Sequence, residues 1–210
     1  GFNVAGVWVA TKHLNTRIWN NVIKNVKVGA GQTAALFAAG LYIFGTATDV
    51  TSGNYYNNAI YDLDNLSSSA TATVRGIYGS SGMQDTIAFN SIWLTGTAAS
   101  AKQSAALWSL THTGQTWRNN IAVNNRVETG AGFGLAFYKA STTSTLTSNN
   151  NDLYVPTNAN SFIGRVGTTN YATLTDWRTQ TYDLASVSHN QAFRAGTDLR
   201  IDTLQGTPVN

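Results

Sequence analysis

Asp62 and Asp64 form the densest acidic group in the sequence, and Arg75 lies near the start of the next apolar segment. Side chains two residues apart point to the same face of a β-strand, so the two carboxylates are expected to lie together. Calcium takes about six to eight oxygen ligands, several of them charged, and this pair would supply part of such a set. The alternative interpretation is an exposed pair of carboxylates beside a solvated arginine.

The sequence is otherwise poor in groups that carry out catalysis. It has 10 acidic residues, only one of them a Glu, together with 3 His and no Cys. The lack of Cys excludes a thiolate nucleophile, a cysteine-ligated metal and a disulfide framework. No Gly-rich phosphate loop, nucleophile elbow or HExxH motif occurs. We therefore expect no catalytic residue, no metal and no cofactor, and we regard an enzymatic role as the weaker interpretation.

Five aromatic residues suggest a binding surface. Each directly follows an aliphatic residue in a short apolar segment, so the ring points outward if the aliphatic side chain points inward. The residues are Tyr42, Tyr78 and Trp108 in one series and Tyr61 and Trp93 in another. Successive outward rings would form a flat strip on which sugars could stack. Two other interpretations stay open, because stacked rings can simply stabilise a protein surface and exposed apolar strips can be protein contacts.

The composition bounds the class of protein. The chain has 29 Thr, 22 Asn, 19 Gly and 16 Ser in 210 residues but only one Glu and one Met, which excludes a helical bundle. The net charge of +3 is spread along the chain without a basic run that could follow a phosphate backbone. No apolar stretch is long enough to span a membrane. We expect neither a nucleic-acid partner nor membrane insertion.

Internal repetition predicts the elements that must position these residues. An Asn-rich phrase followed by an aliphatic residue recurs about every 30 residues, and a phrase of one small and one aliphatic residue lies between its copies. The aliphatic markers of the first phrase are Ile23, Ile60, Ile92, Ile121 and Leu153. Those of the second are Leu41, Ile77, Leu107 and Leu135, which places Ala136 in line with the aromatic residues of the first three.

A coil of this length with several short strands favours a right-handed parallel β-helix of about five coils. A propeller blade is longer, and a leucine-rich repeat would show a ladder of Leu residues. In a β-helix, equivalent side chains of successive coils stack in columns. Asn suits the sharp corners because it tolerates a left-handed backbone, and stacked Asn side chains can bond to one another.

The phrases "RIWNNVIKNV", "NNAIYDL", "FNSIWLTG" and "WRNNIAVNN" resemble coils of the pectin-lyase-like superfamily. The passages "SNNNDLYV", "FIGRVGTTNYATLTDWR" and "DLASVSHNQAF" resemble the closing section of secreted β-helix proteins of Bacteroidota-type bacteria, many of which carry a C-terminal sorting domain. The resemblance implies a secreted or cell-surface protein. It also implies a possible lyase in which Asp62 and Asp64 would hold Ca²⁺ and Arg75 would abstract a proton from an acidic sugar.

We expect one β-helix domain over residues 1–210, with an irregular first coil over 1–30, regular coils over 31–155 and a closing section over 156–210. A short helix is predicted over 174–181, with Thr175 as its N-cap. The favoured function is a non-catalytic extracellular structural or adhesive module, a part of a larger surface protein or one that assembles head to tail through unpaired coil ends. The alternative is a carbohydrate-active domain, either a polysaccharide binder or a lyase. The expected partners are therefore other copies, neighbouring domains or polysaccharide.

Overall fold

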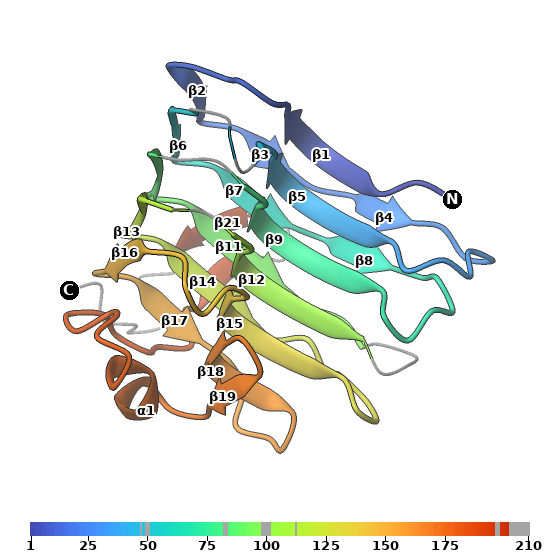
Figure 1. Cartoon of the computed structure of the whole chain (residues 1–210). Helices are drawn as coiled ribbons and strands as arrows, with labels where there is room; N and C mark the ends of the chain where they lie inside the picture. Colours follow the sequence, from blue (N-terminus) through green and yellow to red (C-terminus); the bar gives the residue numbers. More distant parts are fainter. Residues whose placement is uncertain are drawn as a thin grey trace.

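A computed structural model describes residues 1–46, 48, 51–81, 84–97, 102–111, 113–195 and 198–201. The chain winds into a right-handed parallel β-helix of about five coils, about 50% strand and 3% helix (Figure 1). This confirms the fold predicted from the repeat. Residues 202–210 of the expected closing section lie outside the described residues.

Three sheets form the walls of the solenoid, and each coil adds one strand to each sheet. Sheet A, which faces the viewer in Figure 1, is the widest, and its strands run in chain order along the solenoid axis. They are β1 (Val4–Val9), β5 (Phe37–Ile43), β9 (Thr73–Gly79), β12 (Gln103–Ser109), β15 (Phe133–Lys139) and β18 (Ser161–Val166), followed by the antiparallel β19 (Thr169–Tyr171).

Sheets B and C follow sheet A in every coil and are also parallel. Sheet B consists of β2 (Thr16–Trp19), β6 (Gly53–Tyr56), β10 (Asp85–Ala88), β13 (Gln115–Arg118) and β16 (Leu146–Asn149). Sheet C consists of β3 (Val22–Ile23), β7 (Ala59–Tyr61), β11 (Ser91–Leu94), β14 (Ile121–Asn124) and β17 (Asp152–Tyr154). The remaining elements are the pair β4 (Val26–Val28) and β8 (Leu63–Asn65), helix α1 (Leu174–Arg178), and the hairpin of β20 (Phe193–Ala195) and β21 (Asp198–Ile201).

An asparagine ladder forms the corner between sheets B and C. The buried Asn58 donates from Nδ2 to Asn90 Oδ1 at 3.0 Å, and Asn90 and Asn120 repeat the contact with the next coil at 3.0 Å. The residue before each ladder position has a left-handed backbone, with φ of 54° at Asn57, for example. Asn tolerates this conformation better than most residues. The Asn-rich phrases therefore form the sharp corners that their composition predicted.

The interior is a stack of apolar columns. Leu41, Ile77 and Leu107 lie in register on sheet A and are fully buried. On sheet C, Ile60 and Ile92 also stack as predicted. The predicted marker Ile121 is wrong by one residue, because Ile121 pairs with Ser91 and the small Ala122 takes the inward position beside Ile92.

The C-terminal end of the solenoid is closed. Helix α1 packs against β18 at this end of the solenoid (Figure 1). Its Trp177 side chain is fully buried and packs against Gly164 of β18. The predicted N-cap is wrong. Thr173 caps the helix, because its hydroxyl accepts from the Asp176 N–H while Asp176 Oδ2 accepts from the Thr173 N–H, each at 3.1 Å.

Candidate functional site

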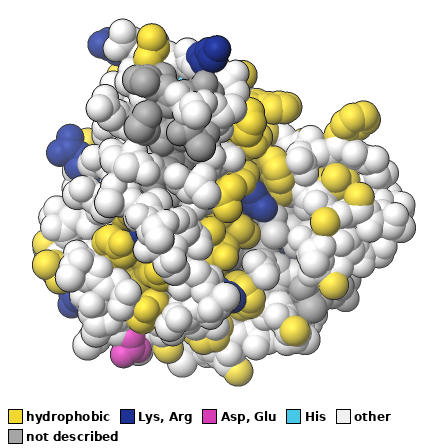
Figure 2. Space-filling view, viewed as in Figure 1, with side chains coloured by type: hydrophobic (Ala, Val, Ile, Leu, Met, Phe, Trp, Pro, Cys, Tyr) yellow, Lys and Arg dark blue, Asp and Glu magenta, His cyan; other side chains and the backbone are white. Residues whose placement is uncertain are grey.

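The outer face of sheet A carries a column of aromatic residues. Tyr42, Tyr78 and Trp108 lie in register, as the sequence predicted. The column begins at Trp8 on β1 and continues through Tyr138. The sequence analysis missed Tyr138 because it aligned Gly134-Leu135 with the small-aliphatic phrase of the earlier coils. In the structure, Trp108 pairs with Tyr138, two residues after the predicted Ala136. Figure 2 shows hydrophobic side chains gathered in a hollow over this sheet.

The aromatic rings of this column pack against one another and against Arg75. Tyr42 and Tyr78 stack with an interplanar angle of 4° and a centroid separation of 4.9 Å. The Arg75 guanidinium carbon lies 4.0 Å from the ring centroids of both Tyr78 and Trp108. Only 5% to 9% of the surface of Tyr42, Tyr78 and Trp108 is exposed to solvent. Little ring surface remains for a sugar, so the geometry fits a stacked column that stabilises the surface.

Arg75 completes this packing. Its neighbours in register are Ala39 and Ala105, whose small side chains leave room for the guanidinium, and its Nε donates to Thr73 Oγ1 at 2.9 Å. Burial lowers the pKa of Arg75, while the Tyr78 hydroxyl acts in the opposite direction. Burial also raises the pKa of Tyr42.

The structure does not bring Asp62, Asp64 and Arg75 together. Asp62 lies at a corner with φ of 53° and pairs with Lys27 Nζ at 2.9 Å. Asp64 Oδ1 accepts from Arg126 Nη1 at 3.2 Å. Arg75 faces the aromatic column instead. Each member of the candidate lyase trio thus has a separate partner.

A buried ionic cluster beside Asp64 was missed from the sequence. Arg126 Nε donates to Glu128 Oε1 at 3.1 Å, and both side chains are 1% exposed. Lys102 Nζ donates to the Asn65 carbonyl, and burial lowers the pKa of Lys102, with the Asp64 and Glu128 charges acting in the opposite direction. Arg126 and Glu128 lie only two residues apart, but Asp64 comes from an earlier coil, so no single phrase of the sequence contains the whole cluster.

Tyr61 and Trp93 lie in register on sheet C, away from the sheet A column. The C-terminal hairpin covers part of this face, with the Phe193 ring centroid 5.6 Å from that of Trp93. The Lys24 Nζ atom lies 6.0 Å from the centroid of the mostly buried Tyr61 ring. The next residue in register is Val123, which interrupts the aromatic series before Tyr154.

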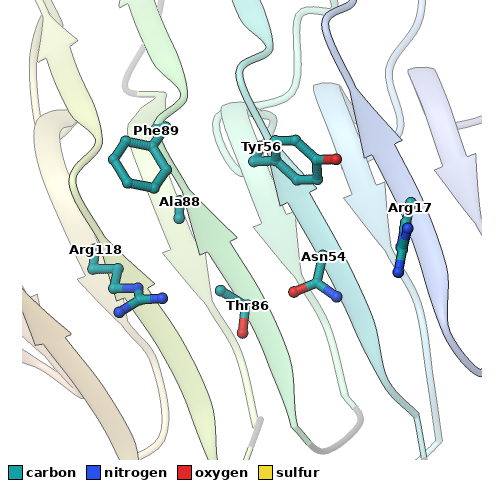
Figure 3. A pocket seen from close by; sticks show the side chains of 7 residues that line it. All are labelled: Arg17, Asn54, Tyr56, Thr86, Ala88, Phe89 and Arg118. Carbon is teal, nitrogen blue, oxygen red and sulfur yellow. The ribbon is translucent and has the colours of Figure 1, made fainter.

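A surface pocket of about 300 Å³ lies on the outer face of sheet B (Figure 3). In Figure 3, Phe89, Ala88 and Tyr56 form one side of the pocket and Thr86 and Asn54 the other. Arg118 and Arg17 stand at opposite ends of the pocket. The sequence analysis did not select these residues, because the recess depends on the register between four coils.

Within the part of the chain that the structure describes, no three His, Asp or Glu side chains gather closely enough to hold a metal ion. The only described helix is far shorter than a membrane-crossing segment. Comparison with protein-family models, with curated proteins and with solved structures gave no match.

Proposed function

We propose that the chain is a non-catalytic, extracellular structural module that pairs with a second copy through its N-terminal coil. The observation that carries the proposal is the apolar surface of the first coil, where large exposed side chains stand beside strand edges that no described residue covers. The resemblance of the coil phrases to secreted β-helix proteins supports the extracellular location. The occupied ring faces on sheet A favour a structural role over sugar stacking there.

The N-terminal coil exposes apolar side chains and strand edges together. Strands β1, β2 and β3 are each the last strand of their sheet among the described residues. Phe2, Trp8, Leu14, Trp19 and Val22 are large, apolar and exposed, Trp8 by 64%. A recess of about 110 Å³ beside Trp8 offers a place for an apolar side chain of a partner. Open edges with exposed apolar groups favour pairing with another chain.

At the C-terminal end, described residues that follow the last coil cover part of the strand edges: the Asp183 N–H donates to the Ser148 carbonyl and the Leu153 N–H to the Val187 carbonyl. The asparagine ladder ends when Asn151 Nδ2 donates to Asp183 Oδ1 at 2.8 Å and the Asn151 N–H donates to Ser186 Oγ at 2.8 Å. The antiparallel β19 covers the edge of β18. A head-to-tail contact would have to displace these groups, so the open ends favour a head-to-head arrangement.

A two-fold axis through the middle of β1 would satisfy all three edges at once. Strand β1 would pair antiparallel with its own copy, and β2 would meet β3 of the other copy. Such self-complementary contacts are the commonest form of protein oligomer. The N-terminal coil carries Lys12, Arg17 and Lys24, besides Lys27, which pairs with Asp62, whereas the first acidic residue of the chain is Asp49. Salt should therefore strengthen the dimer by screening repulsion between the two ends.

Sedimentation velocity over a wide concentration range tests the proposal. The wild-type chain should pass from monomer to dimer as its concentration rises, and at lower concentration when salt is added. Trp8→Lys and Val22→Lys should remain monomeric, because a lysine on an edge opposes pairing. Leu184→Lys is the matched control, since Leu184 is equally exposed but lies in the closing section, and it should dimerise like the wild type.

A wild-type chain that stays monomeric at every concentration and salt level would overturn the proposal. So would association that Leu184→Lys abolishes and Trp8→Lys leaves intact. Circular dichroism of each variant checks that the β-helix is retained.

A further inference from the structure

The carboxylate of Asp152 is buried without a counter-ion. Asp152 begins strand β17 in the last coil, and only 6% of its surface is exposed. The backbone N–H of His189 donates to its Oδ1 at 2.7 Å, and Gln191 Nε2 donates to its Oδ2. No Lys or Arg side chain in the described part of the chain pairs with it. Buried charges are normally paired with an opposite charge or bound to a metal ion.

Two polar atoms beside this carboxylate also lack a partner. The Nδ1 atom of His189 is buried and makes no hydrogen bond to any described residue, although it lies 3.8 Å from Asp152 Oδ2. The Oε1 atom of Gln191, a residue that is 6% exposed, is likewise buried without a donor among the described residues. Because an unsatisfied buried polar group is costly, the two atoms around one carboxylate indicate a further group that contacts all three residues.

His189 and Gln191 approach Asp152 from one segment of the closing section. They lie two residues apart between Val187, which pairs with Asp152, and strand β20. The His189 side chain is 35% exposed, so a small ligand can reach the carboxylate from solvent on that side. Asp152 and His189 are 37 residues apart in the sequence, and no short motif contains both.

We propose that Asp152, His189 and Gln191 bind a divalent transition-metal ion of the Zn²⁺ type. Asp152 Oδ2, His189 Nδ1 and Gln191 Oε1 are the ligands, and water completes the coordination. Metal–ligand bonds of about 2.0–2.2 Å hold two ligand atoms about 3–4 Å apart, and the 3.8 Å between His189 Nδ1 and Asp152 Oδ2 fits this range.

The donor set decides the class of metal. An imidazole nitrogen favours Zn²⁺ and similar ions over Ca²⁺ and Mg²⁺, which prefer sites made only of oxygen. A half-turn of the Gln191 amide brings Oε1 to the place from which Nε2 now contacts Asp152 Oδ2. The His189 N–H keeps its bond to Asp152 Oδ1 and orients the carboxylate.

A bound ion fastens the C-terminal hairpin to the last coil. Gln191 lies two residues before Phe193, which begins β20 and packs on Trp93 of sheet C. Since binding to the folded state stabilises it, Zn²⁺ should raise the Tm and slow hydrogen exchange in β20 and β21. The three residues lie outside β1, β2 and β3, so the site is independent of the proposed dimer.

Titration calorimetry of the full chain, freed of metal with a chelator, tests the proposal with Zn²⁺ as the probe. The wild-type chain should bind one Zn²⁺ ion, and Ca²⁺ at the same concentration should give no saturable heat. His189→Ala and Asp152→Asn should each weaken Zn²⁺ binding at least about tenfold.

Gln191→Glu separates a metal ligand from a simple hydrogen-bond donor. A second carboxylate beside Asp152 should tighten Zn²⁺ binding about tenfold, because affinity rises with ligand charge. The same variant without metal should unfold at a lower temperature than the wild type, because two buried carboxylates repel each other.

His13→Gln is the matched control. His13 also faces a buried carboxylate, with its Nε2 atom 3.2 Å from Asp85 Oδ1. Its Nδ1 atom already contacts the Ala10 carbonyl at 2.9 Å, so both ring nitrogens have a partner. This variant should bind Zn²⁺ like the wild type.

A wild-type chain that binds no Zn²⁺ would refute the proposal, as would His189→Ala with unchanged affinity. Loss of binding in His13→Gln would place the ion elsewhere and contradict the assignment. A Gln191→Glu variant that is destabilised but gains no affinity for Zn²⁺ would show that Gln191 acts only as a hydrogen-bond donor. Circular dichroism checks the fold of each variant, and if Asp152→Asn does not fold, His189→Ala and Gln191→Glu still decide the question.

Discussion

Phe89 shows how a single residue can depart from a repeat without breaking it. Its backbone follows the same left-handed turn as the asparagines of the other corners, although an aromatic side chain gains nothing from that conformation. The buried ladder position that follows, Asn90, keeps its bonds to Asn120. The strain is therefore confined to one exposed residue.

We predict that Phe89→Asn raises the free energy of unfolding by about 1 kcal/mol, because it removes left-handed strain from a bulky residue. Chemical denaturation measures the change. Asn57→Phe is the converse variant, and it should destabilise the protein by a similar amount. If Phe89→Asn instead lowers stability, the ring contributes packing that outweighs the strain of the left-handed backbone.

Tyr55 is a second unfavourable residue, because it places a polar hydroxyl in an apolar interior. Its side chain is fully buried on the inner face of sheet B, and its hydroxyl has no hydrogen-bond partner among the residues that the structure describes. Burial, together with the nearby Asp85 charge, raises the pKa of Tyr55. The folded state then holds this proton at a pH where the unfolded chain, with a tyrosine pKa of about 10, releases it. The stabilisation is complete below about pH 10 and is lost as the pH rises above that value.

We predict that Tyr55→Phe matches or exceeds the wild-type stability at pH 7 by about 1 kcal/mol, because it removes an unpaired buried hydroxyl. Above about pH 10 its stability should fall less steeply than that of the wild type. Burial also raises the pKa of Tyr42 and of Tyr182, so a shallower decline should remain. Thermal unfolding followed across alkaline pH measures both effects. A Tyr55→Phe variant with the wild-type pH profile would contradict the assignment, and Tyr154→Phe, on the partly exposed outer face of sheet C, is the control.

At the scale of elements, the corner between sheets B and C carries much of the specificity of the fold. Asn120 alone makes four hydrogen bonds there: Nδ2 donates to the Ile87 carbonyl and to Asn151 Oδ1, while Oδ1 accepts from the N–H and the Nδ2 of Asn90. Each distance lies between 3.0 and 3.1 Å, and the group is fully buried. Removing the side chain leaves several polar groups without partners.

We predict that Asn120→Ala lowers the free energy of unfolding by about 4 kcal/mol, the cost of leaving buried polar groups unsatisfied. The adjacent Asn119→Gly should change it by only a few tenths of a kcal/mol, because glycine adopts the left-handed turn freely and the Asn119 side chain takes no part in the ladder among the described residues. Denaturant titration of the two variants compares them directly. Equal losses would mean that the turn, rather than the ladder, specifies the corner.

The sequence predicted the strands and corners better than the sites. The reason is that strands and corners recur in every coil, whereas the sites depend on the register between coils. The ladder was predictable because an Asn-rich corner recurs in most coils, and its spacing alone indicates stacking. The predicted alignment of the coils is wrong at two places. At Gly134-Leu135 a similar phrase occurs two residues too early, and at Ala122 a small residue replaces the aliphatic marker. The cluster around Arg126 and the pocket over Ala88 join residues of several coils whose register no single phrase contains.

For the whole molecule, the two ends differ in how well they are held. Trp177 closes the last coil: its Nε1 donates to Asp183 Oδ2 at 2.7 Å, and its ring centroid lies 5.7 Å from that of Phe137. Gly164 permits this packing, because a Cβ there would lie 2.1 Å from the Trp177 ring. Among the described residues, the N-terminal coil has neighbours on one side only. In a solenoid, each coil is stabilised mainly by its neighbours, so end coils open first unless they are capped.

We therefore predict that hydrogen exchange in the wild-type monomer is fastest in β1, β2 and β3 and slowest in the central strands, with β18 protected nearly as well as these. Trp177→Ala should cost about 4 kcal/mol, the loss expected for a buried aromatic ring. In the Trp177→Ala variant, hydrogen exchange should become faster in β18 and β15 and stay unchanged in β1, because each coil is stabilised only by contacts with adjacent coils. Exchange measured by mass spectrometry at a concentration below that of dimerisation resolves these strands. A uniform acceleration through all coils would instead show that the solenoid opens as one cooperative unit and that the closed end protects the whole molecule.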